Sequence, residues 1–375
     1  MEQKRLGDIA TYINGYAFKP EDRGSTGLPI IRIQDLTGNA YDLGFYDGKY
    51  PEKIEINDGD VLISWSASLG VYIWNRGKGL LNQHIFKVVF DKCEVNKQYF
   101  VFAVKYKLKE MELKTHGATM KHIVKKDFDN TVIPFPTVEK QADIAYILSK
   151  IESIVEFRQQ ELQQLDDLIK ARFVEMFGDP VSNPYGYDKI ALSDLADIKI
   201  GPFGSLLHKE DYIDGGHPLL NPSHIVDGKV SPDDKLTISD EKYEELSAYQ
   251  LKTGDVVMGR RGEMGRCAVV PEDGFLCGTG SMLIRTKGEV TADYIQKIIS
   301  FPSFKKTIED MAVGQTMPNL NVPIVSGFQI IKPPMEVQDR YYAFAEQVNK
   351  SKVKVQKALD ETRKLFDSLM QQYFG

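Results

Sequence analysis

Two stretches of the chain carry apolar residues at helical spacing over a length far greater than that of an ordinary helix. The first runs from Val138 to Phe177, and its apolar residues are Ile144, Ile147, Leu148, Ile151, Ile154, Val155, Leu162, Leu165, Leu168, Ile169 and Phe173. The second begins near 335, and its apolar residues are Val337, Tyr341, Phe344, Val348, Val355, Leu359, Leu365, Phe366, Leu369 and Tyr373. Spacings of three and four predict two amphipathic helices. At 1.5 Å per residue the first is a rod of about 60 Å, ended by Gly178 and Pro180.

The segment before each of these helices has a different pattern. Short runs of Val, Ile, Tyr and Phe alternate with turn sequences such as Asn57-Asp58-Gly59 and Asp214-Gly215-Gly216, which predicts strands and hairpins. A helical stretch follows at 97–113 in the first segment and at roughly 292–312 in the second. Each segment then closes with a strand that ends in proline, because proline cannot continue a strand ladder.

These patterns divide the chain into four parts. Residues 1–137 and 179–334 are predicted mixed α+β domains, and residues 138–178 and 335–375 are the long helices. An apolar stripe on a mostly polar helix needs a partner, which the other long helix supplies. The first helix leaves one domain and the second returns from the other. We therefore predict an antiparallel coiled coil that separates the domains with near two-fold symmetry.

The two halves also repeat each other in sequence. Four short motifs occur once in each half, in the same order: Leu6–Ala10 and Leu192–Ala196, Gly59–Val61 and Gly254–Val256, Gly117–Met120 and Gly314–Met317, and Phe177-Gly178 and Phe374-Gly375. The distance between the copies grows only slightly along the chain, as insertions in surface loops permit. The predicted fold class is α+β with one domain duplicated.

Composition excludes several classes of protein. The chain has 375 residues and 42% hydrophobic content, enough for more than one domain with a core of its own. Cys93, Cys267 and Cys277 form no C-x-x-C pair, which argues against a disulfide framework or a cysteine zinc site. The N-terminus is polar and no apolar run approaches the ~20 residues that span a bilayer, so we expect a soluble cytoplasmic protein with no membrane partner.

The sequence contains no complete catalytic motif. A methyltransferase needs a glycine loop for its cofactor and an N-P-P-aromatic element for the base, and Asn183-Pro184-Tyr185 and Asn221-Pro222-Ser223-His224 are better explained as turns. The charged segment SPDDKLTISDEKYEE is typical of a solvated loop rather than a nuclease metal site. The histidines form no H-x-x-x-H pair. We predict no catalytic residue, no metal and no cofactor.

The order of domain, long helix, domain, long helix resembles the specificity subunit of type I restriction-modification enzymes over the whole chain. The motifs that carry this resemblance are L-x-D-[IL]-A, G-D-[VI], G-x-T-M and a helix opening P-x-x-x-x-Q that contains Gln141 or Gln338. No single motif is specific, but their ordered recurrence in both halves is. Lys140 and Val337 depart from the pattern, because each separates a glutamate and a glutamine that are usually adjacent.

The resemblance implies a non-catalytic subunit with two target recognition domains, each of which binds one half of a split duplex DNA sequence. It also implies that the helices fix the gap between the half-sites and dock two methyltransferase subunits, and it leaves open whether restriction or translocase subunits join them. A rod of about 60 Å is longer than one DNA turn of ~34 Å, so the arrangement is workable.

Side-chain chemistry identifies the candidate DNA contacts, because cations bind phosphates and Arg, Asn and Gln recognise base edges. Aligning the halves places Ser64-Trp65-Ser66-Ala67-Ser68-Leu69-Gly70 opposite Gly259-Arg260-Arg261-Gly262-Glu263-Met264-Gly265. From this segment the candidates are Ser64, Trp65, Ser66, Arg260, Arg261 and Arg266. From the G-x-T-M turns and their flanks they are Lys114, His116, Thr119, Lys121, His122, Thr316 and Asn319.

Two alternatives remain open from the sequence alone. The lysine-rich stretch 105–126 is either a DNA-binding surface or a solvated helix face. The whole chain is either the DNA-binding subunit described above or a scaffold for protein interactions, with duplicated domains on a coiled coil and no role in binding nucleic acid. The net charge of −6 does not decide between them, because the first domain is slightly basic and the second is acidic.

Overall fold

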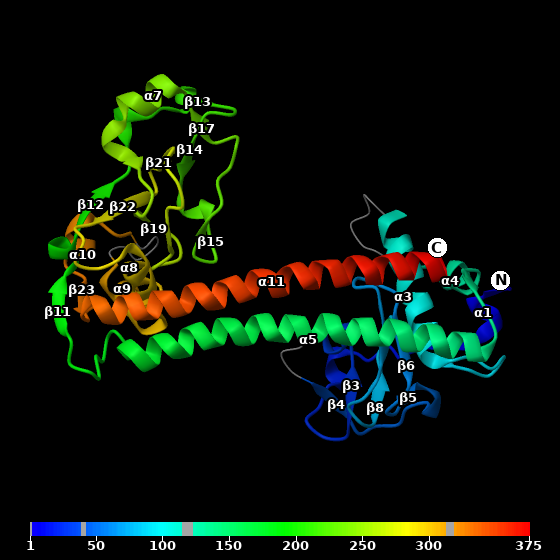
Figure 1. Cartoon of the computed structure of the whole chain (residues 1–375). Coiled ribbons are helices and arrows are strands. Elements are labelled where there is room, and N and C mark those ends of the chain that lie inside the picture. Colours follow the sequence, from blue (N-terminus) through cyan, green and yellow to red (C-terminus); the bar gives the residue numbers. More distant parts are fainter. Residues whose placement is uncertain (1, 39–42, 115–122, 313–318) are drawn as a thin grey trace. The chain divides into compact units, whose positions relative to one another are not determined.

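The computed structural model describes residues 2–38, 43–114, 123–312 and 319–375 (Figure 1). The chain forms two compact units. The first unit contains residues 1–162 and 354–375, and the second contains residues 163–353. Each long helix therefore contributes one part to each unit.

The first unit is built around two sheets of four strands each. The main sheet is antiparallel and has the order β2 (Thr11–Asn14), β9 (Ile85–Val89), β6 (Val61–Ser64), β7 (Gly70–Ile73). The second sheet has the order β4 (Gly44–Tyr46), β3 (Leu28–Ile31), β8 (Gly79–Leu81), β5 (Glu55–Ile56). A short pair joins β1 (Gln3–Arg5) to β10 (Val132–Pro134). The helices are α1 (Leu6–Ile9), η1 (Pro20–Asp22), α2 (Ile33–Thr37), η2 (Glu52–Ile54), α3 (Lys97–Lys114) and α4 (Lys125–Asp129).

The second unit repeats this plan. Its main sheet has the order β12 (Ala196–Ile200), β22 (Ser281–Thr286), β19 (Val256–Gly259), β20 (Cys267–Val269). Its second sheet has the order β13 (Tyr212–Ile213), β17 (Thr237–Ile238), β14 (His217–Leu220), β21 (Phe275–Cys277), β18 (Gln250–Leu251). Two-stranded pairs join β11 (Asp188–Ala191) to β23 (Gln329–Lys332) and β15 (Ile225–Val226) to β16 (Lys229–Val230). The helices are α6 (Leu192–Leu195), η3 (Gly204–Leu206), η4 (Lys209–Asp211), η5 (Pro222–His224), α7 (Asp240–Glu245), η6 (Ser247–Tyr249), α8 (Ala292–Ile299), α9 (Pro302–Met311) and α10 (Val322–Ser326).

The two long helices are α5 (Val138–Phe177) and α11 (Met335–Phe374). In the first unit Arg158 of α5 donates hydrogen bonds to the Ala358 carbonyl and the Thr362 hydroxyl of α11. Residues from earlier in α5 share a core with residues from later in α11, so the two helices are antiparallel. The predicted fold class, α+β with a duplicated domain and two long antiparallel helices, is confirmed.

The same aromatic contact anchors one helix end in each unit. Phe177, the last residue of α5, is fully buried in the second unit with its ring 5.2 Å from that of Tyr294. Phe374, the last residue of α11, is fully buried in the first unit with its ring 5.2 Å from that of Tyr99. The repeated Phe-Gly motif of the sequence thus marks two equivalent packing sites.

A buried glutamine fixes the start of each long helix. Gln141 is fully buried, accepts a hydrogen bond from the Asn96 N–H at 2.9 Å and donates one to the Pro136 carbonyl at 2.8 Å. Gln338 is also fully buried and makes the equivalent two bonds in the second unit. The P-x-x-x-x-Q motif therefore satisfies polar backbone groups where helix and domain meet.

The repeated Gly-Asp-Val motif is part of the scaffold. The carboxylate of Asp60 accepts a hydrogen bond from the Asn57 N–H at 2.9 Å, and that of Asp255 accepts one from the Lys252 N–H at 2.7 Å. The glycine before each aspartate has a φ of 87° or 85°, which only glycine adopts without strain. This turn leads directly into the central strand β6 or β19.

One helix prediction was wrong in detail. The stretch at 292–312 is not one helix but two, α8 and α9, with a break between Ile299 and Pro302. Proline lacks the N–H that a helix interior requires, whereas it fits the first turn of a new helix. Pro302 accordingly begins α9.

Candidate nucleic-acid interface

Three loops of the first unit leave the main sheet along the same edge. The strand register pairs Asn14 with Phe86 and pairs Ser64 with both Ile85 and Gly70. The end of β2, the loop between β6 and β7, and the segment 82–84 before β9 therefore meet at this edge. We call the hairpin residues 65–69, the segment 82–84 and Ile123 the loop edge of the first unit.

Backbone hydrogen bonds hold this loop edge together. The Trp65 N–H donates to the carbonyl of His84 at 3.2 Å, and the Trp65 carbonyl accepts from the Ile123 N–H at 2.9 Å. Ile123 lies three residues after Met120, the last residue of the G-x-T-M segment. The hairpin therefore contacts the first described residue after the G-x-T-M segment, whereas the candidates His116, Thr119, Lys121 and His122 lie outside the described residues.

The second unit has the equivalent loop edge, formed by the hairpin residues 260–266, the segment 278–280 and residues 319–320. The Arg260 N–H donates to the carbonyl of Gly280 at 3.0 Å, and the Arg260 carbonyl accepts from the Leu320 N–H at 2.9 Å. Arg261 also forms an isolated bridge to Asn319. Arg260 and Trp65 thus occupy the same position in two copies of one backbone framework.

Trp65 is a half-buried side chain with neighbours on several sides. Its indole Nε1 donates to the Oδ1 of Asn14 at 3.2 Å. Its ring is stacked on Phe86 with the ring centroids 5.5 Å apart, and it meets His84 edge-on at 4.9 Å. These contacts fix the indole ring, so its remaining surface is held in one orientation.

Arg260 and Arg261 place two positive charges next to each other. The guanidinium of Arg260 is half-buried and its Nε donates to the Oδ1 of Asn319 at 3.1 Å. Burial and the neighbouring Arg261 guanidinium lower the pKa of Arg260. Arg261 is exposed, and its side chain makes no ion pair with any residue that the structure describes. Among the described residues neither guanidinium forms an ion pair with a carboxylate, so the pair favours an anionic or acceptor-rich ligand.

Arg266 differs from the other two arginines because it is neutralised within the domain. It contacts the Glu263 carboxylate at 2.7 Å and donates to the Pro222 carbonyl at 3.2 Å. Lys305 binds the other oxygen of Glu263 at 2.9 Å. Hydrogen bonds from Lys305 and Arg266 lower the pKa of Glu263 to about 2. Arg266 therefore braces the hairpin rather than offering a free charge.

Two serines among the sequence candidates lie inside the hairpin. Ser64 has no exposed surface, and its hydroxyl donates to the Ser68 carbonyl at 2.5 Å. Ser66 is 7% exposed. Burial leaves neither serine surface for a ligand, so we do not retain them as DNA contacts. Small hydroxyl side chains fit inside such a hairpin. A sequence alignment alone could not show whether these two serines are buried or exposed.

Several sequence candidates lie outside the described residues. They are His116, Thr119, Lys121, His122 and Thr316. The side chain of Lys114 belongs with them, although its backbone ends α3. Asn319 is described, and its contact with Arg260 places it at the loop edge of the second unit.

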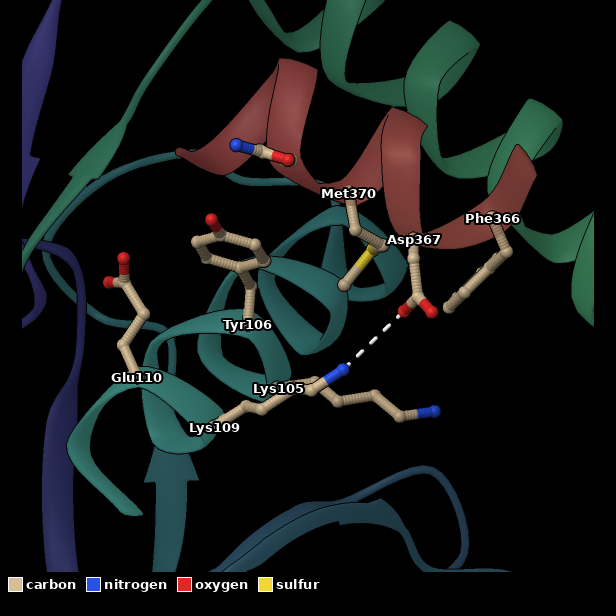
Figure 2. A pocket seen from close by; sticks show the side chains of 8 residues that line it. Lys105, Tyr106, Lys109, Glu110, Phe366, Asp367 and Met370 are labelled. Atoms are coloured by element: carbon tan, nitrogen blue, oxygen red, sulfur yellow. Dashed lines mark hydrogen bonds and ion pairs between the residues drawn. The ribbon is translucent and has the colours of Figure 1, made fainter. Parts of the chain in front are cut away.

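The described lysines of the cationic stretch 105–126 are mostly paired with carboxylates. Lys105 contacts Glu152 of α5 at 2.7 Å, and Lys109 contacts Asp367 of α11 at 3.4 Å, as Figure 2 shows for the latter pair. Within the domain, the pairs are Lys107–Glu110 and Lys125–Asp129. This part of the stretch therefore attaches α3 to the long helices, and the solvated-face interpretation fits it better than DNA binding.

The structure adds one element to each loop edge that sequence reasoning missed. These are the segments Asn82-Gln83-His84 and Gly278-Thr279-Gly280, whose last residues accept the hydrogen bonds from Trp65 and Arg260. In the sequence, the first of these segments is visible as three polar residues between the apolar runs GLL and IFKVVF. Their importance depends on a strand pairing between distant residues, which no local pattern encodes.

Neither metal chemistry nor a membrane span is indicated by the parts of the chain that the structure describes. Across residues 2–38, 43–114, 123–312 and 319–375, no group of three or more His, Cys, Asp or Glu side chains is placed to hold a metal ion. Over the same residues no helix has the length and apolar character needed to cross a bilayer.

Sequence comparison finds a family match in both halves. The family described as type I restriction modification DNA specificity domain matches residues 1–167 and 184–362. The chain is 24% identical over 294 residues to the type I restriction enzyme EcoBI specificity subunit of Escherichia coli, covering 72% of this chain and 62% of that subunit. It is 21% identical over 359 residues to the MjaVIII specificity subunit of Methanocaldococcus jannaschii, covering 90% and 83%. The match thus spans less than two thirds of the Escherichia coli subunit.

Two solved structures share the fold over nearly the whole chain. The S subunit of a type I restriction-modification system from M. genitalium has a TM-score of 0.57 at 14% identity and covers 100% of this chain and 96% of that one. A chain from a study of complex assembly and conformational transition of the type I R-M system has a TM-score of 0.65 at 16% identity and covers 99% and 97%.

Proposed function

We propose that each domain of this chain binds one half of a split duplex DNA sequence. The chain belongs to the type I restriction-modification DNA specificity family, so it is a specificity subunit rather than a catalytic one. The observation that carries the proposal is the pair of loop edges. One backbone framework presents Trp65 in the first unit and Arg260 in the second. Different side chains on one framework are what two domains with different half-sites require.

In the second unit the proposed contacts are Arg260, Arg261 and Asn319. Arginine donates two hydrogen bonds to the O6 and N7 atoms of guanine, and asparagine pairs with the N6 and N7 atoms of adenine. The Oδ1 of Asn319 already accepts a hydrogen bond from Arg260, so Asn319 offers a ligand chiefly its amide N–H donors. Two neighbouring guanidinium groups without a carboxylate gain more from such acceptors, or from phosphates, than arginines that are already paired. Arg266 supports the hairpin through Glu263.

In the first unit the proposed contact from the hairpin is Trp65. Its Nε1–H is already used by Asn14, so the indole contributes apolar contact rather than a donor. Such a surface suits a thymine methyl group or a deoxyribose. Lys114, His116, Thr119, Lys121 and His122 remain predicted contacts of this half-site, and Thr316 of the other, because the residues next to these segments lie at the loop edges.

The proposed protein partners are two methyltransferase subunits. Support comes from an apolar face of α5 that is exposed in this chain, formed by Tyr146 (65% exposed), Ile147, Ile154 and Phe157 (68% exposed). Exposed apolar patches on a helix are typical of protein interfaces. The number of methyltransferase subunits and the presence of a restriction or translocase subunit remain predictions, as does a cytoplasmic location.

The test measures binding of duplex DNA by the chain in complex with its methyltransferase subunits. The half-sites are first defined from the methylation pattern of cellular DNA with and without this gene. The double variant Arg260→Ala, Arg261→Ala should then weaken binding by roughly 5- to 150-fold per lost base contact, equal to about 1–3 kcal/mol. The effect should fall on substitutions in one half-site only.

Lys252→Ala is the matched control for the arginine variant. Lys252 is an exposed cation of the same unit at the opposite end of β19, so its loss should leave recognition of both half-sites unchanged. Equal loss at both half-sites with the arginine variant would contradict the assignment of the hairpin. A complex without preference for any split sequence would contradict the proposed function itself.

A further inference from the structure

The segments 82–84 and 278–280 of the loop edges are held by hydrogen bonds to neighbouring parts of their units. In the first unit the Asn82 N–H donates to the Ile31 carbonyl at 3.0 Å, and the Gln83 N–H donates to the Tyr16 carbonyl at 2.9 Å. A Cβ on Gly15 would lie only 1.9 Å from the Asn82 carbonyl oxygen. Glycine is therefore required at position 15 for this close approach.

His84 completes the turn in an unusual backbone conformation. Its φ is 72°, a left-handed value that costs a non-glycine residue energy. The surroundings hold it there, because its carbonyl accepts from Trp65 and its ring lies 4.9 Å from the indole. The turn between β8 and β9 is thus held by Trp65 on one side and by the backbone of Tyr16 and Ile31 on the other.

Gln83 lies at the tip of this turn. The residue is exposed, and its carboxamide makes no hydrogen bond with any side chain or backbone group among the described residues. The backbone of Gln83 is held in place, whereas its carboxamide has no hydrogen-bond partner among the described residues. A glutamine held in this way loses little backbone entropy when it binds a ligand.

The second unit has the same turn with a different residue at its tip. The Gly278 N–H donates to the Leu220 carbonyl at 3.1 Å, and the Gly280 N–H donates to the Oδ1 of Asn221 at 3.3 Å. A Cβ on Gly201 would lie 2.1 Å from the Gly278 carbonyl oxygen, as for Gly15 in the first unit. Thr279 occupies the exposed tip. The hydrogen bond of the first turn residue and the close approach are repeated, whereas the left-handed φ of His84 and the tip residue are not.

We infer that the tip of this turn determines one base pair of each half-site, and that Gln83 recognises the adenine of an A·T pair. The Gln83 carboxamide would accept a hydrogen bond from adenine N6 and donate one to N7, the two-point contact that glutamine makes in the major groove. Thr279 has one hydroxyl and one methyl group, so it makes a different and less exacting contact in the other half-site. This inference rests on the proposed function and adds a residue and a base to it.

The experiment compares wild type, Gln83→Ala and Thr279→Ala as complexes with the methyltransferase subunits. Each is tested by competition against duplexes in which every base pair of both half-sites is substituted in turn. For Gln83→Ala we expect binding of the wild-type sequence to fall by roughly 5- to 150-fold, together with loss of discrimination at one A·T pair. Thr279→Ala should alter the other half-site only, so each variant is the control for the other.

A modified base tests the two-point contact directly. A duplex with 7-deazaadenine at the identified position lacks the N7 acceptor but keeps its shape and pairing. It should weaken wild-type binding and have little further effect on Gln83→Ala, because both changes remove the same hydrogen bond. Retained binding of the other half-site shows that the variant is folded.

Two results would overturn the inference without affecting the proposed function. Equal weakening at every position of both half-sites would show that Gln83 contacts phosphate, since phosphate contacts carry no sequence information. Unchanged binding and discrimination would show that the turn does not reach the DNA. By contrast, a wild-type complex that prefers no split sequence would fail the proposed function before any variant is compared.

Discussion

Replacing Phe374 by alanine should destabilise the first unit, although that residue follows the whole second domain in the chain. Its side chain is fully buried, with the ring 5.2 Å from Tyr99 and 6.3 Å from Tyr106. Truncation of a buried phenylalanine costs about 3–5 kcal/mol, from lost transfer free energy and the cavity left behind. Since whole domains are stable by about 5–15 kcal/mol, this is a large share. The expected fall in Tm is roughly 6–20 °C.

The assay is native-state hydrogen exchange on the full chain, resolved by peptide. Amides of α3 report on the first unit and amides of α8 on the second. Phe374→Ala should lower the opening free energy of α3 by most of its cost and that of α8 by much less. Phe177→Ala, the equivalent change beside Tyr294, should do the reverse. Phe374→Leu keeps most of the volume and should cost less than either alanine variant.

This reasoning would be refuted by either of two results. In the first, Phe374→Ala changes the protection of α3 by less than about 1 kcal/mol, below the range for a buried phenylalanine. In the second, α3 and α8 lose protection equally in both alanine variants. That result would mean that the two units unfold together and that the buried ring does not stabilise one unit independently of the other.

Two further predictions concern titration. Burial raises the pKa of the Cys267 thiol to about 12. At pH 8 iodoacetamide should therefore label Cys93 first, and mass spectrometry should find Cys267 labelled only on unfolding. Equal labelling rates of the two thiols in the folded protein would contradict the burial of Cys267. Ion pairing lowers the pKa of Glu263 below its unfolded value, to about 2. Its stabilising effect is therefore present above about pH 4.5 and is lost as the pH falls toward 2. Protection factors of residues 260–266, taken relative to the intrinsic exchange rate at each pH, should fall over that window in the wild type and fall less in Glu263→Gln.

Helical periodicity was sufficient to predict the long helices. The predicted span of the first, Val138 to Phe177, is that of α5, because a 3.6-residue apolar period, a glycine stop and a nearby proline all act locally. The repeated motifs predicted the duplication because each motif is likewise a short local pattern in the sequence. The division of the stretch 292–312 into α8 and α9 also has a local cause, because Pro302 is visible in the sequence and begins α9.

The candidate site could be predicted only in part. The hairpin arginines were found because two aligned halves differ there, but the partners of each arginine were not. Arg266 is neutralised by Glu263, three residues away, whereas Arg260 binds Asn319 from a distant segment. The lysines of α3 mislead for a related reason, because their carboxylate partners Glu152 and Asp367 lie on the long helices. Charge counted along a segment says nothing about partners that the fold brings in.

The loop edges show how one fold can carry different specificities without losing stability. At the position of Trp65 and Arg260, both polar backbone groups are bonded to backbone groups of neighbouring segments. At the turns that carry Gln83 and Thr279, backbone hydrogen bonds from Asn82 and Gln83 in one unit and from Gly278 in the other accompany a close backbone approach that requires Gly15 and Gly201. Because the framework is made by backbone atoms and glycines, the free energy of folding depends little on which side chain stands at the exposed tip. Sequence can therefore change at these tips under selection for binding alone, and the two halves of this chain differ there.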